Sequence, residues 1–295
     1  ETTSHRQRIQ STPQFQAFQT SYTRNMISLK EDFDLIIAGQ VDGACDHLLS
    51  EAASLFASKT SLELFDMIHT MRSVDDSVYA HSLNVALISR AIGKWMQFSK
   101  EDLNTLTLAG LLHDIGKTQI PPEILNKQGK LTDEEFDIIR SHAKLGHKIL
   151  KDTDLDLRIK LAALQHHERY DGSGYPRGLE SDEIDTFASI VAIADVYDAM
   201  TAARSYRAPK CAFQVIAAFE DDGFQKYNPK VIFTFLQRVA ACYNNSRVLL
   251  SDGTAGQIVY LNKNTLSRPI VDTVEHGLID LSQSANKDLF IKAIL

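Results

Sequence analysis

The chain has 295 residues, of which 44% are hydrophobic and 23% are charged, and its formal net charge is -7 at pH 7. These values are typical of a folded globular protein, and the negative charge disfavours a long nucleic acid as a partner. No apolar run reaches the roughly 18 residues that a membrane span requires. The three cysteines, Cys45, Cys211 and Cys242, lack metal-site spacing. We therefore expect reduced thiols and a cytoplasmic location.

The start of the chain resembles a connection rather than a domain. It begins at Glu1 without a secretion signal, and we interpret it as a piece of a longer protein. Residues 1–30 are rich in Gln, Ser and Thr, which predicts a frayed tail or a connecting helix. Helical periodicity follows over residues 28–58. We predict an N-terminal helical segment at 1–67, the stub of a regulatory region.

The central helices carry the first candidate site residues. Two helices are expected within 61–98, and in the second one His81 shares a face with apolar residues. The next helix, over 101–115, has Ser99 as a plausible N-cap and runs into His113-Asp114 before glycine and proline end it. A histidine beside a carboxylate at a buried helix end needs a partner, and a metal ion is a strong one. The alternative is an ordinary charged helix terminus.

Further histidines and acids interrupt the downstream helices. A capping box at Thr132 begins a helix that carries His142 on its apolar side. A later helix ends in the pair 166–167, two histidines that can reach one centre only near a frayed end. Residues 171–176 must form a loop. Asp195 then interrupts a helix that is apolar nearly all round, so it must be paired, hydrogen-bonded or metal-bound.

The last part of the chain changes character. Two amphipathic helices are expected within 210–244, and residues 247–283 alternate like short strands around a hairpin at Asp252-Gly253. A terminal helix or tail is expected after them. The fold class is therefore mainly α, a helical bundle with a small β appendage near the C-terminus. We divide the chain at 1–67, 68–246 and 247–295.

The candidate residues share one property, because each interrupts an apolar helix or stands at its end. Each member alone has an ordinary structural explanation, but the whole set favours a metal site over coincidence. The set is His81, His113, Asp114, His142, His166, His167 and Asp195.

Two segments resemble the signatures of a known family. The sequence HDIGK at 113–117 and the sequence HHERYDGSGYP at 166–176 resemble those of the HD-GYP family, a branch of the HD phosphohydrolases. The second signature, with DVYD at 195–198, is the more specific one. The resemblance covers residues 68–245. It implies an HD-type helical bundle that hydrolyses the bacterial messenger cyclic di-GMP to pGpG, with further hydrolysis to GMP as an option.

The resemblance also implies the ligand sets. One metal would be held by His81, His113, Asp114 and Asp195, and a second by Asp114, His142, His166 and His167, with Asp114 bridging. Ser77 stands where one branch of the family has a glutamate that helps to bind a third metal. We therefore expect two divalent ions, iron with manganese as the alternative. Two cations that share a water would generate hydroxide near neutral pH to attack the phosphorus.

The remaining roles follow the same resemblance. Asp114, Lys117 and Asp198 are the candidate catalytic residues, with the Lys117 ammonium on the phosphate and Asp198 orienting the water or acting as general acid. Lys117, Tyr175, Arg204 and Arg207 are the candidate substrate contacts. Glu168 is expected to anchor the loop rather than to bind metal.

Three alternatives stay open. The chain could hydrolyse a related ring such as cyclic GMP-AMP, since purine choice depends on contacts that the sequence does not place. It could be an idle sensor that binds the messenger, although the full ligand set argues against this. A nucleotide or alarmone hydrolase of the wider HD group is disfavoured by the DGSGYP loop. A homodimer and an upstream sensory domain are the expected protein partners.

Overall fold

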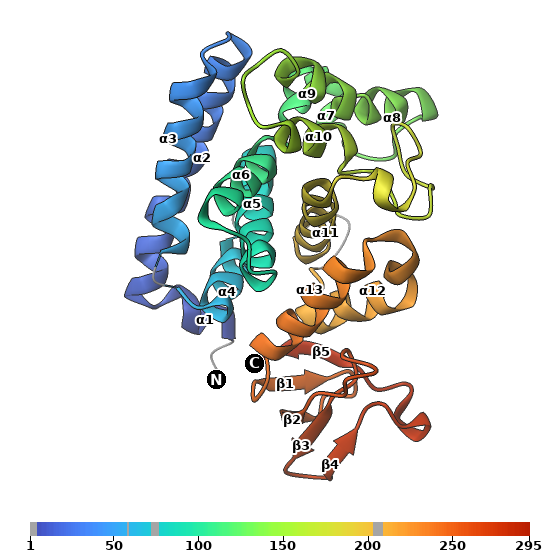
Figure 1. Ribbon diagram of the computed structural model, residues 1–295. Helices are drawn as coiled ribbons and strands as arrows, with labels where there is room; N and C mark the ends of the chain where they lie inside the picture. Colours follow the sequence, from blue (N-terminus) through green and yellow to red (C-terminus); the bar gives the residue numbers. More distant parts are fainter. Residues whose placement is uncertain (1–4, 58, 72–76, 203–208) are drawn as a thin grey trace.

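The computed structural model describes residues 5–57, 59–71, 77–202 and 209–295. It is mainly helical, with a five-stranded antiparallel sheet near the C-terminus (Figure 1), and this confirms the predicted fold class. The α-helices are α1 (His5–Gln10), α2 (Pro13–Ile37), α3 (Val41–Phe56), α4 (Ser61–Met71), α5 (Val78–Trp95), α6 (Lys100–Leu112), α7 (Pro122–Leu125), α8 (Asp133–Arg140), α9 (His142–Leu150), α10 (Leu157–Gln165), α11 (Thr186–Thr201), α12 (Ala212–Lys226) and α13 (Pro229–Cys242). The 3-10 helices are η1 (Ile115–Gln119), η2 (Ser181–Glu183) and η3 (Ser284–Asn286). The strands are β1 (Arg247–Leu250), β2 (Ala255–Tyr260), β3 (Ile270–Thr273), β4 (Gly277–Asp280) and β5 (Ile291–Ile294).

The N-terminal segment forms a long helical hairpin rather than a frayed tail. The Thr12 side chain caps α2 by accepting from the Phe15 amide, and Pro13 occupies the first helical position, where its missing N–H costs nothing. Helices α2 and α3 pack on one another and along α5 and α6 (Figure 1). The inward face of α2 buries aromatic and aliphatic side chains at helical spacing, among them Phe15, Phe18 and Leu29.

Glycines allow the closest helix contacts around the site. A Cβ on Gly110 would lie 2.5 Å from the Ala86 Cα, so only glycine lets α6 approach α5 this closely. A Cβ on Gly116 would lie 2.5 Å from the Gly146 amide nitrogen and would also meet the His142 carbonyl oxygen. The HDIGK glycine is thus required by the packing of η1 against α9.

Several predicted helix boundaries are confirmed. Ser99 caps α6 by accepting from the Asp102 amide, and Thr132 and Glu135 form the expected capping box of α8. One detail differs, because α8 ends at Arg140 and His142 begins a separate helix, α9. The break at Ser141 places His142 at a helix start rather than within the predicted helix.

The C-terminal sheet has the strand order β4-β3-β2-β1-β5. The predicted hairpin joins β1 to β2, with Val248 opposite Gly256. The expectation of a terminal helix or tail was wrong, because β5 pairs with β1 and places Ile294 opposite Val248. This pairing joins residues more than 40 positions apart, and no local pattern specifies such a contact.

One cluster of buried apolar side chains extends from Phe15 on α2 through the central helices to Ile258 and Ile291 of the sheet. The division at residues 67 and 246 stays a prediction. In the described part of the chain, the helices are too short or too polar to cross a bilayer.

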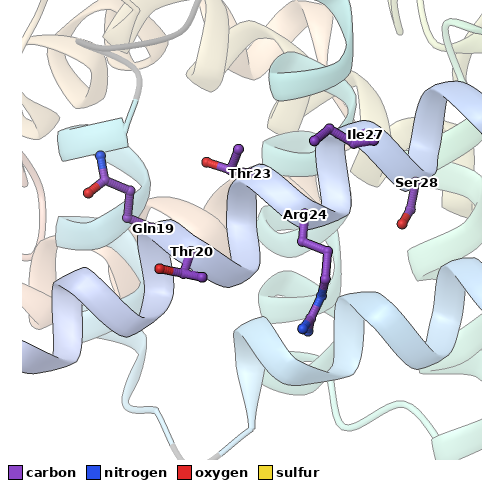
Figure 2. A pocket seen from close by; sticks show the side chains of 6 residues that line it. All are labelled: Gln19, Thr20, Thr23, Arg24, Ile27 and Ser28. Atoms are coloured by element: carbon purple, nitrogen blue, oxygen red, sulfur yellow. The ribbon is translucent and has the colours of Figure 1, made fainter.

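An open hollow lies on the outer face of α2 (Figure 2). It is lined by Gln19, Thr20, Thr23, Arg24, Ile27 and Ser28. All six residues belong to one helix, and none of them belongs to the predicted metal ligands.

Candidate metal centre

Six separate elements bring the seven predicted ligands together. His81 lies on α5 and Asp195 on α11, whereas the others stand at helix ends. His113 follows α6, Asp114 precedes η1, His142 begins α9, and His166 and His167 follow α10. At these positions a side chain can point past the end of its own helix toward a shared centre.

The ligand atoms form two groups that share one carboxylate. Asp114, His142, His166 and His167 offer atoms within 4.8 Å of one another, and so do His81, His113 and Asp114. The Asp114 Oδ1 atom lies 3.2 Å from the His142 Nε2 atom, and its Oδ2 atom lies 3.3 Å from the His113 Nε2 atom. Asp195 joins the second group through its Oδ1 atom, 2.9 Å from His81 Nε2. The sequence prediction divided the residues in the same way.

The histidine rings are oriented for coordination. The Nδ1–H groups of His113, His142 and His166 donate to the backbone carbonyls of Gly110, Ile139 and Ala162, over 2.6, 2.6 and 2.9 Å. Each bond fixes the tautomer whose Nε2 lone pair points into the cluster. This is the arrangement that metal-ligating histidines usually show.

The residues fit a cation because polar atoms at the centre lack other partners. Among the described residues, the His113 Nε2 and Asp114 Oδ1 atoms are buried and make no hydrogen bond. Such orphaned atoms are costly unless a ligand satisfies them. Imidazole and carboxylate together suit iron, manganese or zinc. The cluster can therefore hold divalent metal.

Burial and neighbouring charges shift the pKa values at this centre. Burial lowers the pKa of His166 to about 4 and that of His167 well below its ordinary value, so both rings stay neutral and able to coordinate. Burial opposes ionisation of Asp114, but the adjacent His113 and Lys117 side chains lower its pKa well below the usual range. The Asp114 carboxylate, which both groups share, is therefore ionised.

The pKa of His81 is shifted in the opposite direction, upward. Burial lowers its pKa, but hydrogen bonds to Asp195 and Asp198 outweigh burial and raise the pKa to about 9. The Asp198 Oδ2 atom accepts from the His81 Nδ1–H over 2.7 Å, and Asp198 is fully buried. The structure thus places Asp198 behind His81, in contact with the ring nitrogen that faces away from the cluster.

Lys117 lies at the edge of the centre. Its Nζ atom donates to the Asp114 Oδ2 atom over 2.6 Å, and its side chain is 21% exposed. The ammonium is therefore within reach of both the bridging carboxylate and a ligand entering from solvent.

The loop after α10 is fixed from inside by Glu168, as predicted. The buried carboxylate accepts from the Arg177 and Leu179 amides over 2.7 and 3.0 Å. The Tyr175 ring stacks on His167, with centroids 4.7 Å apart, and the Arg140 guanidinium carbon lies 4.4 Å from the centroid of the Tyr175 ring. Tyr175 therefore packs directly against a predicted ligand.

Two predicted site residues lie outside the described part of the chain, and two residues near the centre were not predicted. Arg204 and Arg207 lie outside the described residues. Sequence reasoning missed Arg140 and Asn84, whose Nδ2 donates to the Asp198 Oδ1 atom over 2.8 Å. Asn84 could have been noticed, because it is a polar residue one turn after His81 on an otherwise apolar face.

Comparison with known proteins agrees with this geometry. The family model described as "HD domain" matches residues 46–231. The chain belongs to the HD domain family. Its two signature segments and their placement at one centre assign it to the HD-GYP branch, and its helical body is an HD-type bundle.

Relatives of this HD-GYP chain carry informative names. A protein of Thermotoga maritima named "Cyclic di-GMP phosphodiesterase" is 39% identical over 179 residues, which cover 60% of this chain and 48% of the relative. A protein of Vibrio cholerae named "3'3'-cGAMP-specific phosphodiesterase 2" is 34% identical over 182 residues, covering 61% of this chain and 35% of the relative. The chain therefore spans about half of the first relative and a third of the second.

A solved structure shares the fold. The structure of Bd1817, an HDG"Y"P protein from Bdellovibrio bacteriovorus, aligns with a TM-score of 0.58 and 19% identity, covering 73% of this chain and 69% of that one. At this identity the likeness concerns the fold alone.

Proposed function

We propose that this chain is a metal-dependent phosphodiesterase that hydrolyses cyclic di-GMP to pGpG and then to GMP. The observation that carries the proposal is the position of Asp114, whose two oxygens face two separate histidine groups. The name of the Thermotoga relative supports the same substrate. We propose two divalent ions, with iron first and manganese as the alternative.

We assign separate metal-binding and substrate-binding roles to the residues of the centre. Bound divalent cations would supply an activated water and neutralise phosphate charge. In our proposal, His81, His113, Asp114 and Asp195 hold one ion, and Asp114, His142, His166 and His167 hold the other. Lys117 places its ammonium on the scissile phosphate as a point charge, for which lysine is suited. Tyr175, Arg204 and Arg207 remain the proposed substrate contacts.

The proposed role of Asp198 changes with the structure. A fully buried carboxylate that accepts from His81 Nδ1–H and from Asn84 is not placed to give a proton to a leaving group. We propose that it orients His81, as carboxylates behind metal-bound histidines commonly do.

Product analysis tests the proposal. Purified protein reconstituted with Fe²⁺ under anaerobic conditions, or with Mn²⁺, should release pGpG from cyclic di-GMP, as followed by liquid chromatography. The double variant His113→Ala with Asp114→Ala should retain its helical circular dichroism and release none. A protein that holds two ions and yet forms no linear product would refute the assignment and favour an idle sensor.

The mixed ring 3'3'-cGAMP is a second candidate substrate, and the name of the Vibrio relative favours it. Comparing kcat/KM for the two rings on one preparation separates the candidates. If kcat/KM is at least tenfold higher for the mixed ring, 3'3'-cGAMP would replace cyclic di-GMP as the proposed substrate.

We also propose the location and the protein partners of the enzyme. A cytoplasmic location fits a bacterial messenger as substrate. A homodimer and an upstream sensory domain are the proposed protein partners, and the first relative is about twice as long as the matched region.

A further inference from the structure

A line of hydrogen bonds runs from the N-terminal helix α2 to His81. The Tyr22 hydroxyl lies 2.7 Å from the Asn84 Oδ1 atom and 3.0 Å from the Ala80 carbonyl oxygen. Asn84 Nδ2 donates to Asp198, and Asp198 accepts from His81 Nδ1–H, over 2.8 and 2.7 Å. Tyr22, Asn84 and Asp198 are each 0% exposed. Bulk water therefore does not compete for these bonds.

The donor and acceptor atoms of each side chain determine the direction of each hydrogen bond. Both Asp198 oxygens accept, Oδ1 from Asn84 and Oδ2 from His81, so Asn84 turns its NH₂ group toward Asp198 and its carbonyl oxygen toward α2. The Tyr22 hydroxyl has a single proton and donates it to this oxygen, which at 2.7 Å is nearer than the Ala80 carbonyl oxygen at 3.0 Å. It therefore favours the one amide orientation that supports Asp198, which in turn holds the Nδ1–H of His81 on the side away from the cluster, with Nε2 facing the cluster.

The tyrosine comes from outside the segment that defines the family. The HD domain match begins at residue 46, whereas Tyr22 lies in the middle of α2. Its neighbours Thr20, Thr23 and Arg24 point away from the core and line the open hollow of Figure 2. One face of α2 is thus exposed, while the opposite face reaches a metal ligand through two intervening side chains.

We propose that Tyr22 is a positioning residue for the metal centre. Through Asn84 and Asp198, its hydroxyl holds the Nδ1–H side of the His81 ring away from the cluster, in the orientation that presents Nε2 to a cation. The geometry on the His81 side of the centre then depends on how α2 is seated against α5. This inference rests on the metal-binding part of the proposed function and is independent of the substrate.

Direct metal binding tests the inference without any nucleotide. Metal-stripped protein is titrated with Co²⁺ and followed by its visible absorption, which reports both affinity and ligand geometry. Tyr22→Phe removes only the hydroxyl, and the ring keeps its contact with Phe18, 5.7 Å between centroids. We expect the affinity for Co²⁺ on the His81 side of the centre to fall about 3- to 10-fold, with an altered spectrum. The loss is smaller than the roughly 10- to 100-fold contributed by direct hydrogen-bond partners of metal ligands, because Tyr22 acts through two intervening side chains.

A double-variant cycle separates positioning from packing. Asn84→Ala should weaken Co²⁺ binding at least as much as Tyr22→Phe, and adding Tyr22→Phe to Asn84→Ala should change nothing further. Tyr243→Phe is the matched control, because it deletes another buried tyrosine hydroxyl, one that lies 3.5 Å from the His69 Nδ1 atom. Its Co²⁺ titration should match that of the unmodified protein.

The inference fails if Tyr22→Phe leaves affinity and spectrum unchanged, if its effect persists in the Asn84→Ala background, or if Tyr243→Phe produces the same loss. A metal-binding protein that shows the predicted coupling but hydrolyses neither cyclic dinucleotide would refute the proposed function and leave this inference standing.

Discussion

The Asp114 side chain is both buried and ionised. It is buried, with 1% of its side chain exposed, and its pKa is held well below the ordinary range by His113 and Lys117 despite the burial. Each oxygen faces a different histidine group. A buried, ionised and bridging carboxylate is stable only with positive charge nearby, which two cations would supply.

Removing this carboxylate should therefore empty both sites. We expect Asp114→Ala to bind neither ion, whereas His142→Ala should lose only the ion on its own side. Elemental analysis of metal per chain after reconstitution measures both. Two ions per chain in Asp114→Ala would remove the bridging role.

Lys117 should matter for turnover more than for metal. Its ammonium contacts Asp114 but contributes no metal ligand. We expect Lys117→Ala to keep its metal content and to lower kcat about 10²-fold, the usual loss for one electrostatic contact to the transition state. Steady-state kinetics and metal analysis on one preparation check this. A fall in metal content at unchanged kcat would show that the side chain supports the centre instead.

At the scale of elements, most of the predicted ligands stand at helix ends that glycine allows to approach one another. Helix α6 ends at the HD pair, η1 continues from it, and α9 starts with His142 against η1. Close backbone approach at Gly116 joins these pieces. A side chain there would separate His142 from Asp114.

Gly116→Ala should therefore damage both stability and the metal centre. The added Cβ meets backbone atoms of α9 that cannot move as a side chain would. We expect a loss of about 3 kcal/mol or more in unfolding free energy, as for other overpacked sites. Urea denaturation measures it.

The matched control is Gly43→Ala, in helix α3. Its Cβ would meet nothing within 4 Å, so the change should be neutral or stabilising by about 0.5–1 kcal/mol. Equal effects of the two substitutions would mean that the contact between η1 and α9 yields easily.

For the molecule as a whole, the centre makes stability depend on pH when metal is removed. His166 has its pKa lowered to about 4 from an ordinary 6.5, so the unfolded chain takes up this proton first, and stability falls as pH drops from 6.5 to 4. His81 has its pKa raised to about 9, so its contribution is complete below pH 6.5 and is lost as pH rises to 9.

We therefore expect the metal-free protein to be most stable near pH 6.5, with each limb amounting to about 3 kcal/mol. Asp114 and Asp195, whose pKa values are lowered from an ordinary 3.8, add a further loss only below about pH 4. Urea midpoints in chelator from pH 4 to 9.5 give the profile. Substituting His81 by glutamine should flatten the alkaline limb alone, and an unchanged limb would exclude His81 as its source.

Features that depend on residues close together in the chain could be predicted from the amino-acid sequence. The Ser99 cap, the Thr132 capping box and the hairpin after β1 follow from residues within a few positions of one another. The ligand types were also readable, because a histidine or aspartate stands out on an apolar helix. Their division into two groups came from family resemblance, and the geometry agrees with it.

Contacts between side chains far apart in the chain could not be predicted and were found in the folded structure. The place of Asp198 behind His81 joins residues 117 positions apart, and the contact of Tyr22 with Asn84 joins residues 62 apart. The pairing of β5 with β1 is of the same kind. Such contacts depend on how helices and strands pack over the whole core. Local propensities of the chain do not specify which surfaces will face each other.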